Sequence, residues 1–103
     1  MEIQVFYAEK IGVPFQEFDS ENSNYDLVWE GTSADLEIYK FLEDENLLEI
    51  IFNKFNIDGR PKNFPHDARA LSIGDVVSLD YRSYLCDTQG WKRLENFNLS
   101  LKP

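Results

Sequence analysis

Residues 46–80, NLLEIIFNKFNIDGRPKNFPHDARALSIGDVVSLD, join a helical pattern, a loop and a strand pattern in one stretch. The apolar side chains of its first part recur at helical spacing and form one broad face: Leu47, Leu48, Ile51, Phe52 and Phe55. Asn46 is the expected N-cap of this helix, because Glu49 stands three residues later at the spacing of a capping box. The pattern predicts a helix over about 46–55.

The second part of the stretch predicts the end of the helix and the start of a strand. Gly59 can end the helix, and Pro61 cannot continue it. The run that begins at Asp75 is rich in β-branched residues and predicts a strand over 75–81. We expect a core built from Leu47, Ile51, Phe52, Phe55, Leu71, Val76, Val77 and Leu85. Replacing Phe52 by alanine is expected to cost about 3–5 kcal/mol of stability, as for an emptied aromatic core site.

Working outward from this stretch, alternating apolar and polar residues predict further strands over 2–8, 25–30, 84–87 and 91–94. In the second of these, Tyr25, Leu27 and Trp29 are expected on one face and Asp26, Val28 and Glu30 on the other. Arg82 and Ser83 are expected at a turn or bulge, and Phe97, Leu99 and Leu101 can extend the last strand along a sheet edge.

A second helical pattern precedes the stretch. Thr32 is the expected cap of a helix over about 33–43, followed by a break at Glu43–Asn46. One continuous helix through residue 55 is the alternative. The order of elements predicts a single α+β domain over 1–103, with an antiparallel sheet of about five strands and one or two helices packed on one face.

Composition narrows the function classes. Apolar residues make up 43% of the chain, which is typical of a folded domain rather than a disordered segment. No apolar run is long enough to span a membrane, and the first residues lack a signal-peptide pattern, so we expect a cytoplasmic location. The formal charge is −9, and residues 1–50 carry 13 acidic and 2 basic residues. The negative charge of this N-terminal half repels nucleic-acid phosphates and attracts basic proteins.

The sequence lacks the motifs that are typical of catalytic, metal-binding and phosphate-binding sites. Cys86 and His66 each have the sequence context of an ordinary structural or surface residue rather than of a catalytic pair. The chain has no Cys-x-x-Cys or His-x-x-His spacing and no glycine-rich phosphate loop. We therefore expect no enzyme activity, no cofactor and no metal site.

One set of residues matches the pattern of a known family: Phe52, Phe55-Asn56, Pro61, Phe64, the run Arg69–Val77, Asp87 and Gly90-Trp91. On these residues the sequence resembles the YodL-like domain, most strongly over 46–95. Ala70, Gly74 and Trp91 depart from the residues common in that family. The resemblance implies an accessory role on mobile DNA of Gram-positive bacteria, and it implies no catalytic residue. Small proteins of such elements include anti-CRISPR proteins.

These observations lead to a functional hypothesis with two competitors. The chain is expected to be an acidic binding protein, encoded on a phage or plasmid, that inhibits a type II CRISPR nuclease directly or through guide RNA or nuclease levels. The alternatives are an accessory module of a plasmid or conjugative element with another protein partner, and a small enzyme. The partner is expected to be a basic nucleic-acid-handling protein, with no direct nucleic-acid or membrane binding. The expected partner-binding residues are Asp19, Glu21, Asp26, Glu30, Glu43, Asp44, Glu45 and Glu49.

Overall fold

The computed structural model describes residues 1–19, 24–56, 60–61, 64, 68–95 and 97. Within these residues the strands are β1 (Glu2–Ala8), β2 (Tyr25–Thr32), β3 (Val76–Leu79), β4 (Arg82–Cys86) and β5 (Trp91–Leu94), and the helices are α1 (Asp44–Asn56) and the 3₁₀ turns η1 (Phe15–Glu17) and η2 (Ala34–Leu36). Leu99 and Leu101, which were expected to extend the last strand, lie outside the described residues, as do Gly59 and His66.

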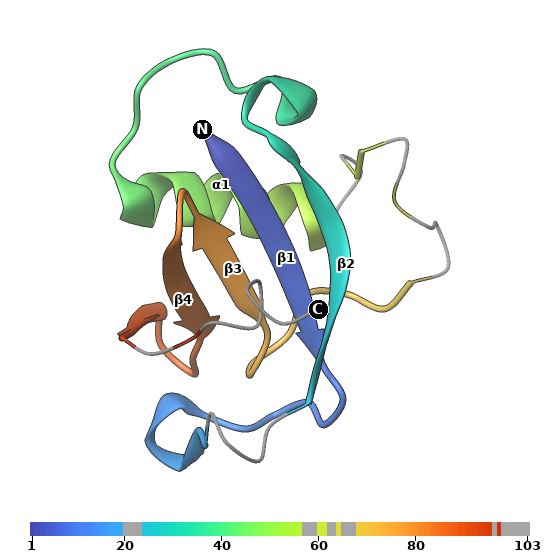
Figure 1. Ribbon diagram of the computed structural model, residues 1–103, viewed down its shortest axis with the longest axis vertical. Coiled ribbons are helices and arrows are strands. Elements are labelled where there is room, and N and C mark those ends of the chain that lie inside the picture. Colours follow the sequence, from blue (N-terminus) through green and yellow to red (C-terminus); the bar gives the residue numbers. More distant parts are fainter. Residues whose placement is uncertain (20–23, 57–59, 62–63, 65–67, 96, 98–103) are drawn as a thin grey trace.

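The strands form one antiparallel sheet in the order β2-β1-β3-β4-β5, and α1 crosses behind it (Figure 1). The predicted α+β class is confirmed. Strand β3 is central, and its pairing with β1 joins the two N-terminal strands to the C-terminal meander.

The core lies between α1 and the sheet. Helix α1 buries Leu47, Leu48, Ile51 and Phe55, at the helical spacing that the sequence predicts. The Phe55 ring packs edge-on against Trp29 of β2, with ring centroids 5.6 Å apart, and against Phe64 at 5.0 Å. Phe52, expected in the core, is only partly buried, against Trp91 of β5. The expected stability cost of 3–5 kcal/mol therefore applies to Phe55 rather than to Phe52.

The predicted helix over 33–43 is wrong. Only the 3₁₀ turn η2 forms, and Glu37 ends it in the left-handed region with φ 61°. Leu36 and Ile38 are buried, whereas Tyr39 and Phe41 are exposed. A second amphipathic helix would need an apolar surface to cover, and α1 already covers the back of the sheet. Residues 37–43 instead form a loop that arches away from the sheet (Figure 1).

The start of α1 also differs from the prediction. The helix begins at Asp44, and the Glu43 carbonyl accepts the N–H groups of Asn46 and Leu47. Asn46 is therefore inside the first turn rather than at the N-cap. Two carboxylates in this turn, Asp44 and Glu45, fit the positive end of the helix dipole.

A β-bulge changes which faces the β2 side chains occupy. The register passes from Val5 opposite Trp29 to Phe6 opposite Leu27, so Val28 is the extra residue. Glu30 pairs with Gln4 and Asp26 pairs with Tyr7, and these two β1 residues lie on opposite faces because an odd number of positions separates them. The expectation that Asp26 and Glu30 share a face is wrong for this reason.

A tight hairpin joins β3 to β4. Asp80 and Tyr81 both have positive φ, 46° and 73°, as a two-residue turn between twisted antiparallel strands requires. The strand expected over 75–81 therefore ends at Leu79, and Arg82 and Ser83 lie in β4 rather than at a turn.

The turn before β3 needs glycine at position 74. Gly74 has φ +99°, and a Cβ there would lie 3.2 Å from the Val13 carbonyl oxygen. Gly74→Ala is expected to lower the free energy of unfolding by about 1–3 kcal/mol, since it combines backbone strain with this contact. Urea unfolding followed by circular dichroism measures the loss. Gly90→Ala is the matched control, because Gly90 has φ +72° but a Cβ added there would meet nothing within 4 Å; an equal loss in both variants would contradict the packing argument.

Candidate functional site

The run Arg69–Val77, which carries part of the family resemblance, is built around an ion pair whose carboxylate is buried. The Asp75 carboxylate is fully buried, and Arg69 donates to both of its oxygens at 2.7 and 2.8 Å. The same carboxylate accepts the N–H groups of Ala8 and Ser72, each at 2.7 Å. Arg69 also donates to the Ala8 carbonyl and lies over the Tyr7 ring. Because these bonds fix the loop to itself and to the end of β1, the pair is structural.

Two further contacts attach this loop to the rest of the fold. The Asn56 side chain at the end of α1 accepts the Leu71 N–H at 2.6 Å and donates to the Leu71 carbonyl at 3.1 Å. The Tyr25 hydroxyl donates to the Gly74 carbonyl at 2.6 Å. Burial, followed by the nearby Asp75 charge, raises the pKa of Tyr25 to about 12, so the hydroxyl remains a donor at neutral pH.

An open groove lies between the start of α1 and the β4–β5 hairpin. Its volume is about 1160 Å³. Glu43, Asp44, Glu45 and Glu49, which the sequence selects as partner-binding residues, are brought together along its helical side. The sheet side carries Arg82, Tyr84, Trp91, Lys92 and Arg93. The groove therefore has an acidic and a basic side.

Asp44 is already engaged within this groove. Its carboxylate accepts from Arg82 at 2.7 and 2.9 Å and from the Tyr84 hydroxyl at 2.5 Å. The Arg82 hydrogen bond is the main cause that lowers the pKa of Asp44 below its ordinary value of 3.8. Asp44 thus holds the start of α1 to β4, and we assign it a structural role instead of partner binding.

The Asp44–Arg82 pair predicts a pH dependence. A folded-state pKa below the unfolded one means that Asp44 stabilises the fold above about pH 3.8 and loses this effect as pH falls through the lower, folded value. Asp44→Asn is expected to lower the melting temperature at pH 7 and to flatten its decrease below about pH 4. Thermal melts of both proteins across this range measure the difference. Parallel curves would show that Asp44 does not carry the acid sensitivity.

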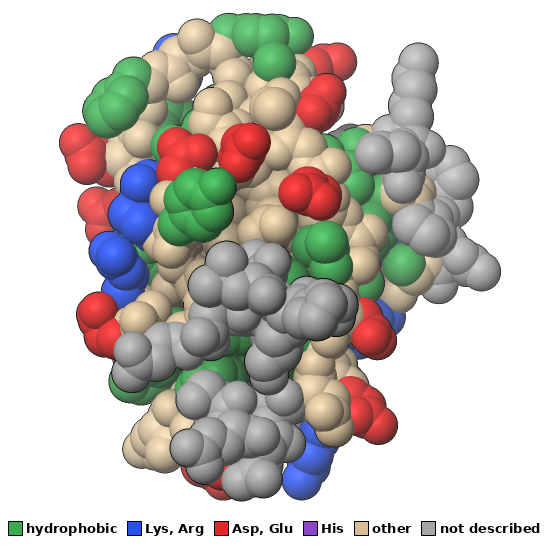
Figure 2. Space-filling model, viewed as in Figure 1, with side chains coloured by type: hydrophobic (Ala, Val, Ile, Leu, Met, Phe, Trp, Pro, Cys, Tyr) green, Lys and Arg blue, Asp and Glu red, His purple; other side chains and the backbone are tan. Residues whose placement is uncertain are grey.

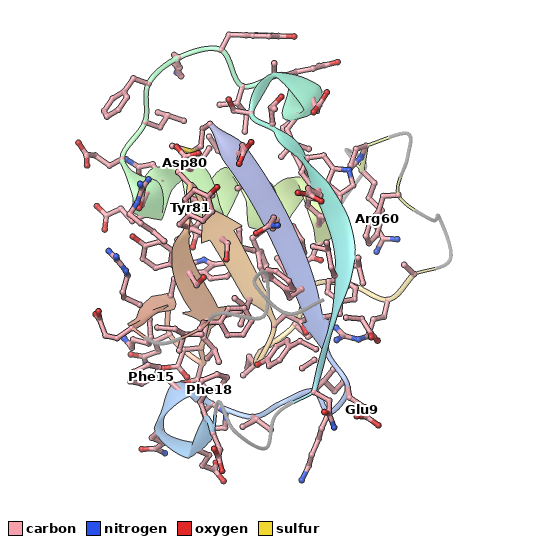
Figure 3. All side chains as sticks on the ribbon, viewed as in Figure 1. Glu9, Phe15, Phe18, Arg60, Asp80 and Tyr81 are labelled. Atoms are coloured by element: carbon pink, nitrogen blue, oxygen red, sulfur yellow. The ribbon has the colours of Figure 1, made fainter. Side chains whose placement is uncertain are left out.

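The sequence does not predict the most exposed aromatic side chains. Tyr39 and Phe41 in the 37–43 loop are 80% and 86% exposed, and Tyr81 at the tip of the β3–β4 hairpin is 81% exposed. Figure 3 shows Tyr81 at the end of the sheet opposite Phe15 and Phe18. The ion pair between Arg82 and Asp44 connects the β3–β4 hairpin to the start of α1, which directly follows the 37–43 loop. We call Tyr39, Phe41 and Tyr81, with the carboxylates of Glu43, Glu45 and Glu49, the aromatic–acidic end.

With this geometry in place, comparison with known proteins identifies the family. The model of the YodL-like domain matches residues 4–97, which is nearly the whole chain. The chain belongs to the YodL-like domain family. It is also 22% identical over 114 residues to a protein named "Uncharacterized protein R785" of Acanthamoeba polyphaga mimivirus, with 97% of this chain and 98% of the viral protein covered. No solved structure matches it.

In this YodL-like domain the remaining predicted carboxylates lie apart from the groove. Asp26 and Glu30 are on the edge strand β2, and Asp19 follows η1. Glu21 lies outside the described residues. Figure 2 shows carboxylates over the upper part of the front face, while hydrophobic side chains project at the top and upper left, where Figure 1 has the 37–43 loop. Among the described residues, Glu43, Glu45 and Glu49 have no ion-pair partner.

Metal ligands and the thiol can be assessed in the described part of this YodL-like domain. Among the described residues, the cysteine and carboxylate side chains include no group of three that could hold a metal ion. Cys86 is buried, and burial raises the pKa of its thiol to about 11, which disfavours the reactive thiolate. No described helix is long and apolar enough to cross a membrane.

Proposed function

We propose that this YodL-like domain is a non-enzymatic binding protein that docks its aromatic–acidic end on a basic, nucleic-acid-handling protein. The observation that carries the proposal is the exposure of Tyr39 and Phe41 in the loop that leads into the acidic start of α1. Burying these rings in the chain's own core would stabilise the fold, so their outward position has a cost that partner binding would offset. Aromatic side chains are also enriched among the residues that dominate protein–protein binding energies.

The charges favour a basic partner. Glu43, Glu45 and Glu49 have no ion-pair partner among the described residues and line the same groove. The exposed 37–43 loop leads directly into this groove at its acidic side. Carboxylates around an aromatic anchor steer association with a positive surface, and this attraction weakens as salt rises. Nucleic-acid channels are such surfaces.

We further propose that the partner is a type II CRISPR nuclease and that the chain is an anti-CRISPR inhibitor encoded on a mobile element. Such nucleases hold their guide–target duplex in a positively charged channel, which an acidic protein of this size could occupy. The proposal includes the bacterial cytoplasm as the location, because the nuclease works there.

A DNA-cleavage assay with the purified, guide-loaded nuclease tests this proposal. Wild type in excess is expected to stop cleavage, and Glu43→Lys/Glu45→Lys is expected to need at least about tenfold more protein for the same inhibition. Glu9→Lys/Glu17→Lys is the matched control: it makes the same change in net charge and should inhibit like wild type. Glu9 lies at the opposite end of the sheet, as does Phe15, which shares the turn η1 with Glu17 (Figure 3).

Two outcomes would contradict the proposal in different ways. If wild type in large excess leaves cleavage unchanged, direct inhibition is wrong. If both double variants lose inhibition equally, net charge rather than the aromatic–acidic end is responsible. A pull-down that returns a plasmid or conjugation protein in place of the nuclease would favour the accessory-module alternative.

A further inference from the structure

The outer edge of β2 presents backbone groups that β1 does not use. The even-numbered residues of β1 point their backbone N–H and C=O groups away from β2. The backbone of Glu2 bonds to Asp80, and the backbone of Ala8 bonds to the side chains of Asp75 and Arg69. In an antiparallel pair, residues that face each other without bonding point their N–H and C=O groups away from each other. The β2 residues opposite these even-numbered positions therefore point their N–H and C=O groups toward the outer edge of the sheet. These β2 residues are Thr32, Glu30, Leu27 and Tyr25.

Among the described residues, a side chain bonds to the outward backbone groups at only one end of this edge. The Thr32 N–H donates to the Asp35 carboxylate at 2.7 Å, as expected for a group that points away from β1. Glu30 and Leu27 have no such bond among the described residues. Within the described residues, the part of the edge without a bonding partner is thus centred on these two residues, on either side of the bulge at Val28.

The side chains around this edge are acidic on both faces of the sheet. The bulge directs Asp26 to the α1 face and Glu30 to the front face. Leu27, between them, is 48% exposed. A strand added here would therefore place its side chains beside a carboxylate on either face and beside an apolar contact at Leu27.

We propose that the edge of β2 binds an extended, lysine- or arginine-rich segment of the partner as a sixth strand. This inference rests on the proposed function for the basic character of the partner, and it adds a second contact of defined geometry. Backbone hydrogen bonds to Glu30 and Leu27 would supply affinity, and the carboxylates would select basic side chains. A second copy of this chain is a poorer occupant, because two acidic edges would face each other.

The probe is a short peptide of alternating lysine and threonine, compared with a peptide of equal charge in which prolines replace threonines. Full-length wild type is expected to bind the first peptide at least about tenfold more tightly, because proline lacks the N–H that a strand needs. Amide hydrogen exchange of Glu30 and Leu27 should slow at least about tenfold on binding. Trp29 is the internal control, since its N–H already faces β1 and should not change.

Each outcome decides the proposal. Equal affinities for the two peptides, protection elsewhere, or no binding at millimolar peptide would overturn it. A dimer that Glu30→Pro abolishes would overturn it in favour of a second copy. If the peptide does not bind at β2 while the chain still inhibits the nuclease, only the edge proposal is wrong. If the peptide binds at β2 but the nuclease does not bind the chain, only the proposed function is wrong.

Discussion

Asp75→Ala is expected to lower the free energy of unfolding by about 3–5 kcal/mol, because it removes a fully buried carboxylate that accepts from Arg69 and from two backbone N–H groups. The substitution removes the partner of Arg69 and leaves the N–H groups of Ala8 and Ser72 without their acceptor. Urea unfolding followed by circular dichroism measures the loss.

The control for this variant is Asp87→Ala. Asp87 also accepts a backbone N–H, that of Phe15, but it lies near the surface and has no arginine partner among the described residues. We expect a much smaller loss from it. A loss in Asp75→Ala no greater than in Asp87→Ala would show that the Arg69–Asp75 ion pair is not what fixes the loop, and would reopen a functional role for Arg69 and Asp75.

Phe55→Ala is expected to cost about 3–5 kcal/mol, because this ring is fully buried between Trp29 and Phe64. Phe52→Ala makes the same chemical change about one helical turn earlier, at a partly buried ring against Trp91. Its loss should be less than half as large. Equal losses from the two variants would contradict the observed orientation of α1 on the sheet.

Local sequence patterns predicted much of the fold because its core residues repeat at the spacing of their own element. Leu47, Ile51 and Phe55 follow the helix period, and Val76 with Val77 begin a buried strand. The β2 bulge has no such local signal. One extra residue depends on how β1 and β2 pair, and it reversed the expected relation between Asp26 and Glu30.

The aromatic–acidic end shows why the site was predicted only in part. Clustered acidic residues were visible in the sequence, and the structure brings Glu43, Glu45 and Glu49 to one groove. The role of Asp44 depends on Arg82, which is 38 positions away in the chain. Tyr39 and Phe41 fitted a helical stripe as well as an extended loop. Their exposure follows from α1 occupying the surface that such a helix would need.

Calorimetric titration of a guide-loaded type II CRISPR nuclease with wild type and with Tyr39→Ala/Phe41→Ala tests the central claim most directly. Both rings are exposed, so the variant should keep wild-type stability within about 0.5 kcal/mol. We predict saturable binding of wild type that weakens as salt rises, and an affinity at least about 30-fold lower for the variant, as for two interface anchors. The control Phe15→Ala, at the opposite end of the sheet, should bind like wild type (Figure 3). Equal affinity of wild type and the Tyr39→Ala/Phe41→Ala variant, or no binding of wild type, would contradict the account.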